Sequence, residues 1–173
     1  MPISSAFVAL GSNLGDRAAN LQAAVVALRE LGEVRAVSPF YETAPVGILA
    51  QPDFLNAVAL VGTALPPEGL LDALLRIERD HGRDRQHAVP KGPRTLDLDL
   101  LDYDGRVLET PRLTLPHPEI QNRAFVLRPL LDLAPDWRHP VSHASAAELL
   151  QALKEHDGGQ VVHPYPLASK KTL

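Results

Sequence analysis

The sequence predicts an α+β fold, a sandwich in which helices cover one face of a mainly antiparallel sheet. Short apolar runs of strand length alternate with segments of helical period, in the order strand, helix, strand, strand, helix, strand. This βαββαβ order is that of the ferredoxin-like sandwich. Because 173 residues suffice for one domain with a sizeable core, we expect a single domain over 1–173, with C-terminal additions to the sandwich.

The composition, 45% hydrophobic and 22% charged residues, is that of a globular protein. The net charge of −4 gives no basic field that would attract nucleic acid or a membrane, and no obligate protein partner is indicated. The absence of cysteine excludes disulfides, cysteine-ligated zinc and thiol catalysis. Residues 1–5 lack the features of a signal peptide and no apolar window reaches transmembrane length, so we expect a cytoplasmic location.

The first strand and helix are joined by a glycine-containing turn. Residues 6–10 form an apolar run that ends in the turn 11–16, where Asn13 or Asp16 can cap the following helix. Gly32 is placed to close that helix. The turn matches neither dinucleotide-binding nor Walker A spacing, so we interpret it as a strand-to-helix connection.

The second and third strands precede the second helix. We expect strands over 34–43 and 54–62, with Pro39 bending the first of them or placing it at an edge. The two prolines that open the segment 66–82 are tolerated in the first turn of a helix, and Gly82 is suited to its end.

A basic segment follows over residues 83–95. It contains four basic residues and one acidic residue, a net charge of +3 in a chain whose total charge is negative. No hydrophobic period organises it, so we predict a mobile, positively charged loop. Arg94 lies near its end, two residues before the next predicted strand.

The strand predicted over 96–103 carries two acids. Side chains alternate between faces, so Asp97 and Asp99 share one face and stand about 6.5–7 Å apart. Carboxylates that hold Mg²⁺ beside an arginine that pairs with phosphate, here Arg94, are the equipment of phosphoryl transfer. The alternative is the solvated face of a half-exposed strand.

The strand is followed by Asp104 and Gly105, a pair typical of two-residue hairpin turns. It predicts that 106–109 pair with 96–103. The sheet face without helices must be covered by loops and the C-terminal third of the chain, or remain open as a cleft. The two acids of the strand could face that cleft.

The C-terminal third contains two predicted helices. An extended segment, 112–118, precedes a helix over 123–133. Ser145 and Glu148 have the spacing of a capping box and predict the start of a last helix. We expect the tail 157–173 to be loosely held.

Several stretches together resemble the 6-hydroxymethyl-7,8-dihydropterin pyrophosphokinase family of folate synthesis. The most specific is Gly92–Leu101, which looks like the signature of that family. Supporting stretches keep their order and approximate spacing over residues 5–135, namely 11–15, 40–43, 51–56, 77–78, 82–85, 115–117 and 122–125. The ferredoxin-like fold of the family agrees with the order of elements above.

The resemblance implies transfer of diphosphate from ATP, the co-substrate, to the hydroxymethyl oxygen of the reduced pterin, with release of AMP. It implies two Mg²⁺ ions held by Asp97 and Asp99 against the ATP phosphates, and catalytic roles for Arg83 and Arg94 in stabilising the transferred phosphates. Because the family forms no covalent intermediate, positioning and charge stabilisation supply most of the catalysis.

The resemblance also implies which residues bind each substrate. ATP would contact residues from several elements: Glu78, Arg85, Leu100, Arg112, Thr114, His117 and Arg123. The pterin would bind between backbone groups, one amide and two aromatic rings: Thr43, Ala44, Val46, Asn56, Phe54 and Phe125.

The sequence departs from the family pattern at a few positions. Val89, Pro90 and Lys91 stand where an aromatic or an Arg-Trp pair is usual; Lys91 supplies charge but not bidentate geometry. Phe54 replaces a common tyrosine, and Pro118 follows His117 where an aromatic can stand.

Two other functions are compatible with the pattern of residues. A nucleotidyltransferase also uses paired acids with Mg²⁺ but releases diphosphate rather than AMP. A ferredoxin-like module that binds nucleotide or RNA without catalysis is the other; the missing aromatic strand platform and the negative net charge argue against RNA.

Overall fold

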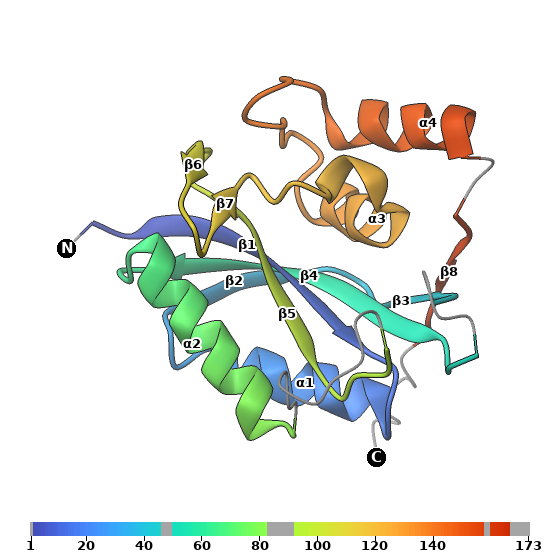
Figure 1. The fold of residues 1–173 in the computed structure, drawn as a ribbon, viewed down its shortest axis with the longest axis horizontal. Coiled ribbons are helices and arrows are strands. Elements are labelled where there is room, and N and C mark those ends of the chain that lie inside the picture. Colours follow the sequence, from blue (N-terminus) through green and yellow to red (C-terminus); the bar gives the residue numbers. More distant parts are fainter. Residues whose placement is uncertain (1, 46–49, 83–91, 158–159, 167–173) are drawn as a thin grey trace, which may run out of the picture.

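The computed structural model describes residues 2–45, 50–82, 92–157 and 160–166. Its main sheet has the strand order β5-β1-β4-β3-β8, and β2 also pairs with β4 (Figure 1). Every pairing in this sheet is antiparallel. The strands of the main sheet are β1 (Ser4–Ser12), β2 (Glu33–Val37), β3 (Tyr41–Thr43), β4 (Phe54–Thr63), β5 (Asp97–Tyr103) and β8 (Val162–Pro164).

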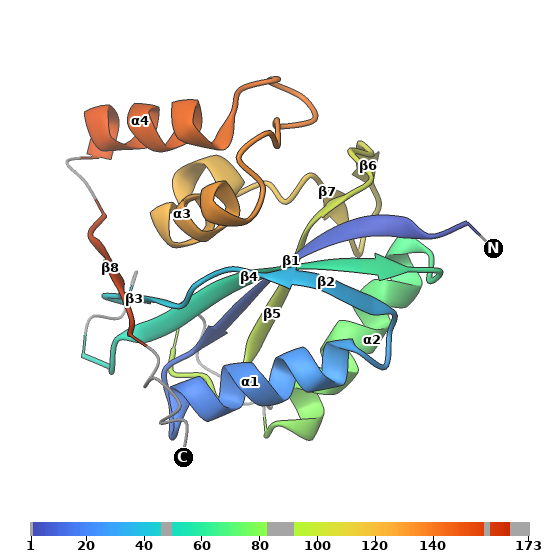
Figure 2. The ribbon, with the colours of Figure 1, turned by 180° about the vertical axis from the view of Figure 1, so that it is seen from behind.

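The helices form a layer on each side of this sheet. In Figures 1 and 2, α1 and α2 lie along one face, and α3 and α4 lie beyond the other. The helical segments are α1 (Arg17–Leu28), α2 (Pro67–Asp80), the 3₁₀ turn η1 (Ile120–Asn122), α3 (Ala124–Leu133) and α4 (Ala146–Asp157). Across the described ranges, no helix combines the length and hydrophobicity needed to cross a bilayer. The predicted ferredoxin-like sandwich and the cover by the C-terminal third are confirmed.

Two hydrophobic cores result, one on each face. The first lies between the sheet and α1 and α2, and its fully buried leucines include Leu10, Leu21, Leu28, Leu70, Leu74 and Leu96. The second lies under α3 and α4 and includes Val58, Leu101, Leu127, Leu130 and Trp137. The second core covers only part of its face, which leaves room beside α3 for a cavity.

The strand predicted over 34–43 is two strands, β2 and β3, that both pair with β4. The interruption lies where the sequence placed a bend. The Ser38 backbone N–H donates to the carbonyl of Val58 (2.9 Å), and the Val58 N–H donates to the Ser38 hydroxyl (2.9 Å). Because Pro39 has no N–H to continue the ladder, the serine side chain supplies a pairing group in its place.

The predicted hairpin between 96–103 and 106–109 is wrong, although its turn is present. Asp104 and Gly105 both have positive φ (52° and 67°), as a type I′ turn requires. However, Asp104 is bonded to β1, donating its N–H to the Ser5 carbonyl (2.8 Å). The chain then leaves the sheet, and β6 (Leu108–Glu109) pairs with β7 (Thr114–Leu115).

The tail is more ordered than expected over 160–166. There β8 pairs with β3, with Val162 opposite Thr43, and the Tyr165 N–H donates to the carbonyl of Phe40 (2.9 Å). The free edge of β3 therefore holds a segment whose own sequence carries no strong strand signal. Residues 167–173, and most of the charged loop predicted over 83–95, lie outside the described residues.

A bulge in β5 joins the sheet to the second core. Val8 pairs with Leu100 and Phe7 with Asp102, so Leu101 is the extra residue. As a result, two consecutive residues interact on the side of the sheet that faces α3. Leu101 packs in the second core, and Asp102 accepts from the Trp137 indole N–H (2.7 Å). The carboxyl group of Asp102 is buried and also accepts from the Gly105 N–H (2.7 Å).

We expect Trp137→Phe to lower the free energy of unfolding by about 2–3 kcal/mol, because a buried carboxyl group loses a hydrogen-bond partner. Tyr103→Phe is the matched control, since the Tyr103 hydroxyl donates to a neutral acceptor, the Leu65 carbonyl (2.7 Å). That variant should lose about 1 kcal/mol. Urea unfolding measures both values, and equal losses would contradict the importance of the charged acceptor.

Candidate active site

The two acids of β5 face a cavity on the α3 side of the sheet. Asp97 and Asp99 are partly buried and line the cavity, while Leu98 and Leu100 are buried in the core against α1 and α2. The alternation predicted from the sequence is therefore confirmed. The bulge at Leu101 comes after the acids and leaves their orientation intact.

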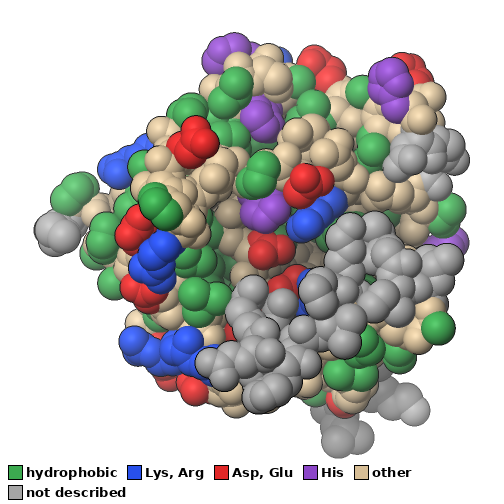
Figure 3. All heavy atoms as spheres, viewed as in Figure 1, with side chains coloured by type: hydrophobic (Ala, Val, Ile, Leu, Met, Phe, Trp, Pro, Cys, Tyr) green, Lys and Arg blue, Asp and Glu red, His purple; other side chains and the backbone are tan. Residues whose placement is uncertain are grey.

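The cavity has a volume of about 500 Å³ and opens between the sheet, η1 and the start of α3. In Figure 3, acidic and basic side chains adjoin one another in a hollow near the middle of the face. Nine residues predicted from the sequence line the cavity: Thr43, Ala44, Phe54, Asn56, Arg94, Asp97, Asp99, Arg123 and Phe125. Segments far apart in the sequence thus meet at one site.

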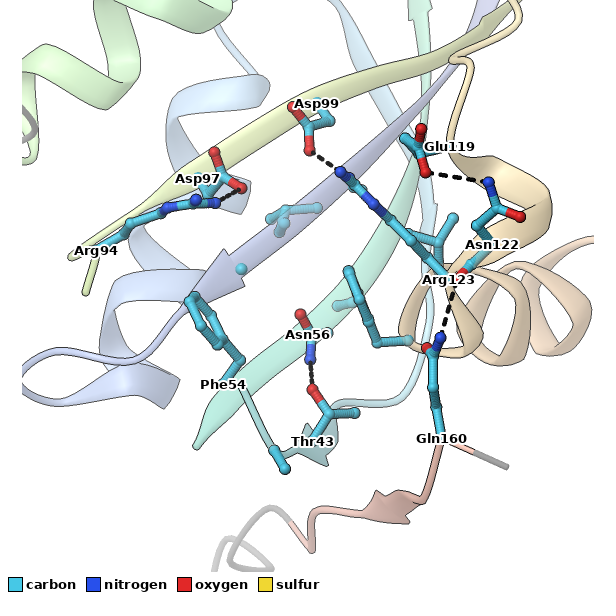
Figure 4. A pocket seen from close by; sticks show the side chains of 17 residues that line it. Thr43, Phe54, Asn56, Arg94, Asp97, Asp99, Glu119, Asn122, Arg123 and Gln160 are labelled. Carbon is cyan, nitrogen blue, oxygen red and sulfur yellow. Dashed lines mark hydrogen bonds and ion pairs between the residues drawn. The ribbon is translucent and has the colours of Figure 1, made fainter. Parts of the chain in front are cut away.

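Each acid is paired with a different arginine. The Arg94 Nη1 atom lies 2.9 Å from Asp97 Oδ2, and the Arg123 Nη1 atom lies 3.5 Å from Asp99 Oδ2 (Figure 4). Each guanidinium also lies over an aromatic ring, Arg94 5.9 Å from the centre of Phe54 and Arg123 5.7 Å from that of Phe125.

These distances allow cation–π attraction. The site therefore consists of two units, each with an acid, an arginine and an aromatic ring. One unit approaches from the segment before β5 and the other from the start of α3 (Figure 4).

Burial, and after it the neighbouring Asp97 carboxylate, raise the pKa of Asp99 to about 7 against the opposing effect of Arg123. Two carboxylates side by side in a partly desolvated site repel each other. The arginines offset this repulsion only in part, so a multivalent cation placed between the acids would stabilise their ionised forms.

The donor set fits magnesium that is shared with a substrate. In the part of the chain that the structure describes, no group of three or more His, Cys, Asp or Glu side chains is arranged to hold a metal. Mg²⁺ commonly binds through one or two carboxylates and completes its octahedral shell with water and substrate phosphates. Asp97 and Asp99 match that pattern and do not match an all-protein metal cage.

The opposite end of the cavity is less charged. The Asn56 side-chain N–H donates to the Thr43 hydroxyl (2.8 Å), and both residues are buried. Gly11 keeps this end open, since a Cβ added there would lie 3.4 Å from Asn56 Oδ1 and 3.9 Å from a Phe54 ring carbon. An amide and two aromatic side chains, Phe54 and Phe125, line the same cavity, and this combination suits a flat heterocycle with alternating donors and acceptors.

Asn13 braces the segment that carries Arg94. The Asn13 side chain is buried; its Oδ1 accepts from the Arg94 N–H (2.7 Å), and its Nδ2 donates to the Pro52 carbonyl (2.9 Å). The sequence offered Asn13 or Asp16 as the cap of α1, and Asp16 is the cap, accepting from the Ala19 N–H (3.1 Å). Asn13 is thereby available to join two loops that flank the cavity.

Five residues predicted to bind nucleotide do not line the cavity. Leu100 of β5 is buried in the first core, and Glu78 of α2 is buried and accepts from the Leu98 N–H (3.3 Å). Arg112 is bonded to Asp72 of α2, while Thr114 and His117 lie in and after β7. Three further predicted residues, Val46, Arg83 and Arg85, lie outside the described residues.

The sequence analysis assigned no role to eight residues that line the cavity: Ala9, Leu10, Gly11, Ala57, Glu119, Asn122, Val126 and Gln160. The sequence analysis placed Gly11 in a connecting turn, but Gly11 belongs to β1 and pairs with Asn56 on one side and Asp97 on the other. A glycine within a strand can mark a close approach to a ligand. The Asn122 side chain, at the end of η1, donates to Glu119, which precedes η1 (3.1 Å). Gln160 comes from the segment expected to be loosely held, and it has no local sequence signal.

His117 is neutral at pH 7. Burial, and after it the positive charge of Arg123, lower its pKa to about 4. The Glu119 N–H donates to His117 Nδ1 (3.1 Å), so the proton of the neutral ring lies on Nε2. Near the cavity the ring can therefore act as a hydrogen-bond donor without adding charge.

Comparisons with known proteins show which proteins this chain resembles. A sequence profile of the family described as 7,8-dihydro-6-hydroxymethylpterin-pyrophosphokinase matches residues 7–135. A relative from Pseudomonas aeruginosa, named 2-amino-4-hydroxy-6-hydroxymethyldihydropteridine pyrophosphokinase, is 51% identical over 140 residues, 80% of this chain and 85% of its own. A relative of the same name from Haemophilus influenzae is 42% identical over 154 residues, 88% of this chain and 94% of its own.

Solved structures agree on the fold. The crystal structure of Plasmodium falciparum HPPK-DHPS wild type with pteroate matches 91% of this chain with a TM-score of 0.70. The sequence identity is 17%, so this likeness supports the fold alone, and the match covers 44% of that longer chain.

We expect the His117 ring to titrate with a midpoint near 4 in the folded protein, far below its unperturbed value of about 6.5. The unfolded chain then binds the proton more tightly. Stability is therefore highest above about pH 6.5 and falls as the pH drops from about 6.5 to about 4. NMR titration of the ring protons measures the midpoint, and His117→Gln should reduce the loss of stability over this range.

The matched control is Arg123→Met, which removes one cause of the depressed pKa while His117 remains buried. The His117 midpoint should rise in this variant. A midpoint near 6.5 in the unmodified protein would contradict the assignment.

Proposed function

The chain belongs to the 7,8-dihydro-6-hydroxymethylpterin-pyrophosphokinase family, and we propose that it transfers diphosphate from ATP to the hydroxymethyl group of 6-hydroxymethyl-7,8-dihydropterin, releasing AMP. The observation that carries the proposal is the single cavity in which two acid–arginine pairs adjoin a pocket made of an amide and two aromatic rings. A donor of phosphate and a flat acceptor would meet in it.

The charged end of the cavity would bind the phosphates of ATP. Asp97 and Asp99 would hold Mg²⁺, which supplies charge neutralisation to the phosphates when bound. Arg94 and Arg123 would turn from their acids toward phosphate oxygens, since guanidinium groups bind carboxylate and phosphate in the same geometry. Their pairing with Asp97 and Asp99 supports this role, because the arginines are already at the site where negative charge would arrive.

The less charged end would bind the pterin. Thr43 fixes one donor of the Asn56 amide, so its Oδ1 is available as an oriented acceptor for an N–H of the ring. Phe54 and Phe125 would pack against the ring. Because both aromatic residues also lie under the arginines, binding of the pterin would keep the guanidinium groups in place.

The proposed reaction needs no covalent intermediate. The acceptor hydroxyl oxygen forms a bond to the β-phosphorus of ATP, the bond from that phosphorus to the oxygen bridging the α- and β-phosphates breaks, and AMP leaves with the bridging oxygen. The hydroxyl proton is released to solvent. Arg94 and Arg123 would stabilise charge on the transferred group, and the pocket around Asn56 would hold the hydroxyl in line.

Nucleotide analysis tests the function directly. Protein, Mg²⁺, ATP and the reduced pterin should yield one AMP for each pterin consumed, with no reaction if either substrate is omitted. Release of diphosphate would instead indicate nucleotidyl transfer, and unchanged ATP would indicate a binding module.

We expect Asp97→Ala and Asp99→Ala each to reduce turnover by at least about 10³-fold, because each variant removes a negative charge that would hold the cation against the phosphates. Both should remain folded, since removal of either acid relieves repulsion inside the cavity. Steady-state AMP release and thermal unfolding measure the two effects. Asp136→Ala, at an exposed position outside the cavity, is the matched control; near-normal turnover in both cavity variants would refute the metal assignment.

We expect Arg94→Ala to lower kcat by about 10²-fold and to weaken ATP binding less, because the arginine would act mainly on charge that develops during transfer. Comparison of kcat with the Kd of a non-hydrolysable ATP analogue separates the two effects. Arg29→Ala, which removes an exposed arginine at the end of α1, should match the unmodified protein. A loss confined to KM would mean that Arg94 binds ground state and transition state equally.

A further inference from the structure

The helix that presents Arg123 and Phe125 begins without a cap of its own. Arg123 occupies the N-cap position of α3, and its side chain makes no capping hydrogen bond. A guanidinium group has no acceptor and cannot cap a helix start, where Ser, Thr, Asp or Asn is usual. Placing the arginine beside Asp99 therefore leaves backbone N–H groups of α3 in need of another acceptor.

Gln160 supplies that acceptor from the other end of the chain. Its Oε1 accepts from the Ala124 N–H (3.0 Å), and its Nε2 donates to the Asn122 carbonyl (2.9 Å). These are the two peptide groups on either side of Arg123, so one side-chain amide binds the backbone before and after this residue. Figure 4 shows Gln160 beside Asn122 and Arg123. Between them Arg123 is extended, with φ −125° and ψ 100°.

Gln160 is itself anchored to the opposite wall of the cavity. Two residues later, Val162 of β8 pairs with Thr43 of β3, and Thr43 holds Asn56. The short segment from Gln160 to β8 therefore connects the wall that carries Arg123 with the wall that would bind the pterin. This segment lies beyond residues 7–135, the range that matches the family.

We infer that Gln160 is a positioning residue that sets the backbone at Arg123, and thereby the placement of its guanidinium at the phosphate end of the cavity. The inference rests on the proposed function for its kinetic consequences. Its structural part, the bond between Gln160 and the start of α3, stands on the geometry alone.

The test uses Gln160→Met in the full-length protein, because methionine keeps the length of the side chain without its hydrogen bonds. We expect kcat/KM for ATP to fall about tenfold, the size of effect that a shift of about 1.4 kcal/mol in transition-state stabilisation produces. Gln151→Met is the matched control, since Gln151 is an exposed residue of α4 whose side chain donates within the helix to Glu155 (3.1 Å). This variant should keep the kcat/KM of the unmodified protein.

A double-mutant cycle distinguishes positioning from a general loss of stability. If Gln160 acts through Arg123, Gln160→Met should cost no further activity in an Arg123→Ala background, while the thermal midpoint still falls. An equal loss of activity in both backgrounds would overturn the inference.

If Gln160→Met does not fold, Gln160→Glu is the second variant, because it keeps an acceptor for the Ala124 N–H and loses the donor to the Asn122 carbonyl. Kinetics equal to those of the unmodified protein in that variant would also overturn the inference.

Hydrogen exchange of the Ala124 amide gives a readout that needs no substrate. Protection should be lost in Gln160→Met and retained in Gln151→Met. If the unmodified protein forms no AMP while this pattern holds, the proposed function fails and the structural part of the inference stands. Unchanged protection of Ala124 in Gln160→Met would overturn the inference whatever the enzyme does.

Discussion

The arrangement of the site depends on the repulsion between two carboxylates on one strand. Asp97 and Asp99 must share a face because β5 alternates its side chains, and burial of Leu98 and Leu100 in the first core fixes that face. The cavity desolvates the acids, and the pKa of Asp99, raised to about 7, reflects the cost. An arginine beside each acid reduces this cost in the free protein. The same charges would be reused when phosphates and a cation arrive, so the free protein is already close to the charge distribution that transfer would need.

The fold brings these charges together by using both faces of one sheet for different purposes. The face against α1 and α2 is a continuous core that holds β1, β4 and β5 rigidly. The other face is only partly covered, by α3 and α4, and the uncovered part is the cavity. Arg94 reaches it from the segment before β5, which Asn13 holds in place. Arg123 reaches it from the start of α3, which Gln160 holds. Arg94 and Arg123 thus both lie on backbone segments that accept or donate hydrogen bonds with a side chain from a distant part of the chain.

The sequence predicted those features of the fold that depend on neighbouring residues and on the order of the elements. The period of two in β5 predicted which way the acids point, and the order of elements predicted the sheet topology. The bulge at Leu101 and the pairing of β6 with β7 were not predictable in this way, because both depend on contacts with β1 and on the competition between possible strand partners. Asn13 was noticed as a polar residue in a turn, but its bond to the Arg94 backbone joins residues 81 positions apart. Gln160 could not be found from the sequence, since an amide that binds backbone groups leaves no pattern.

The acid pair alone does not define the reaction. Paired strand acids with a divalent cation serve diphosphate transfer and nucleotidyl transfer equally, and the arginines favour phosphate in both cases. The difference lies in which phosphorus the acceptor reaches, and that is set by the distance between the acceptor pocket and the acids. Here Gly11 lies between them, with no side chain to separate Asn56 from Asp97. In the proposed reaction the acceptor would therefore lie directly against the phosphates, and the sheet that carries Asn56 and Asp97 would determine which phosphorus it meets.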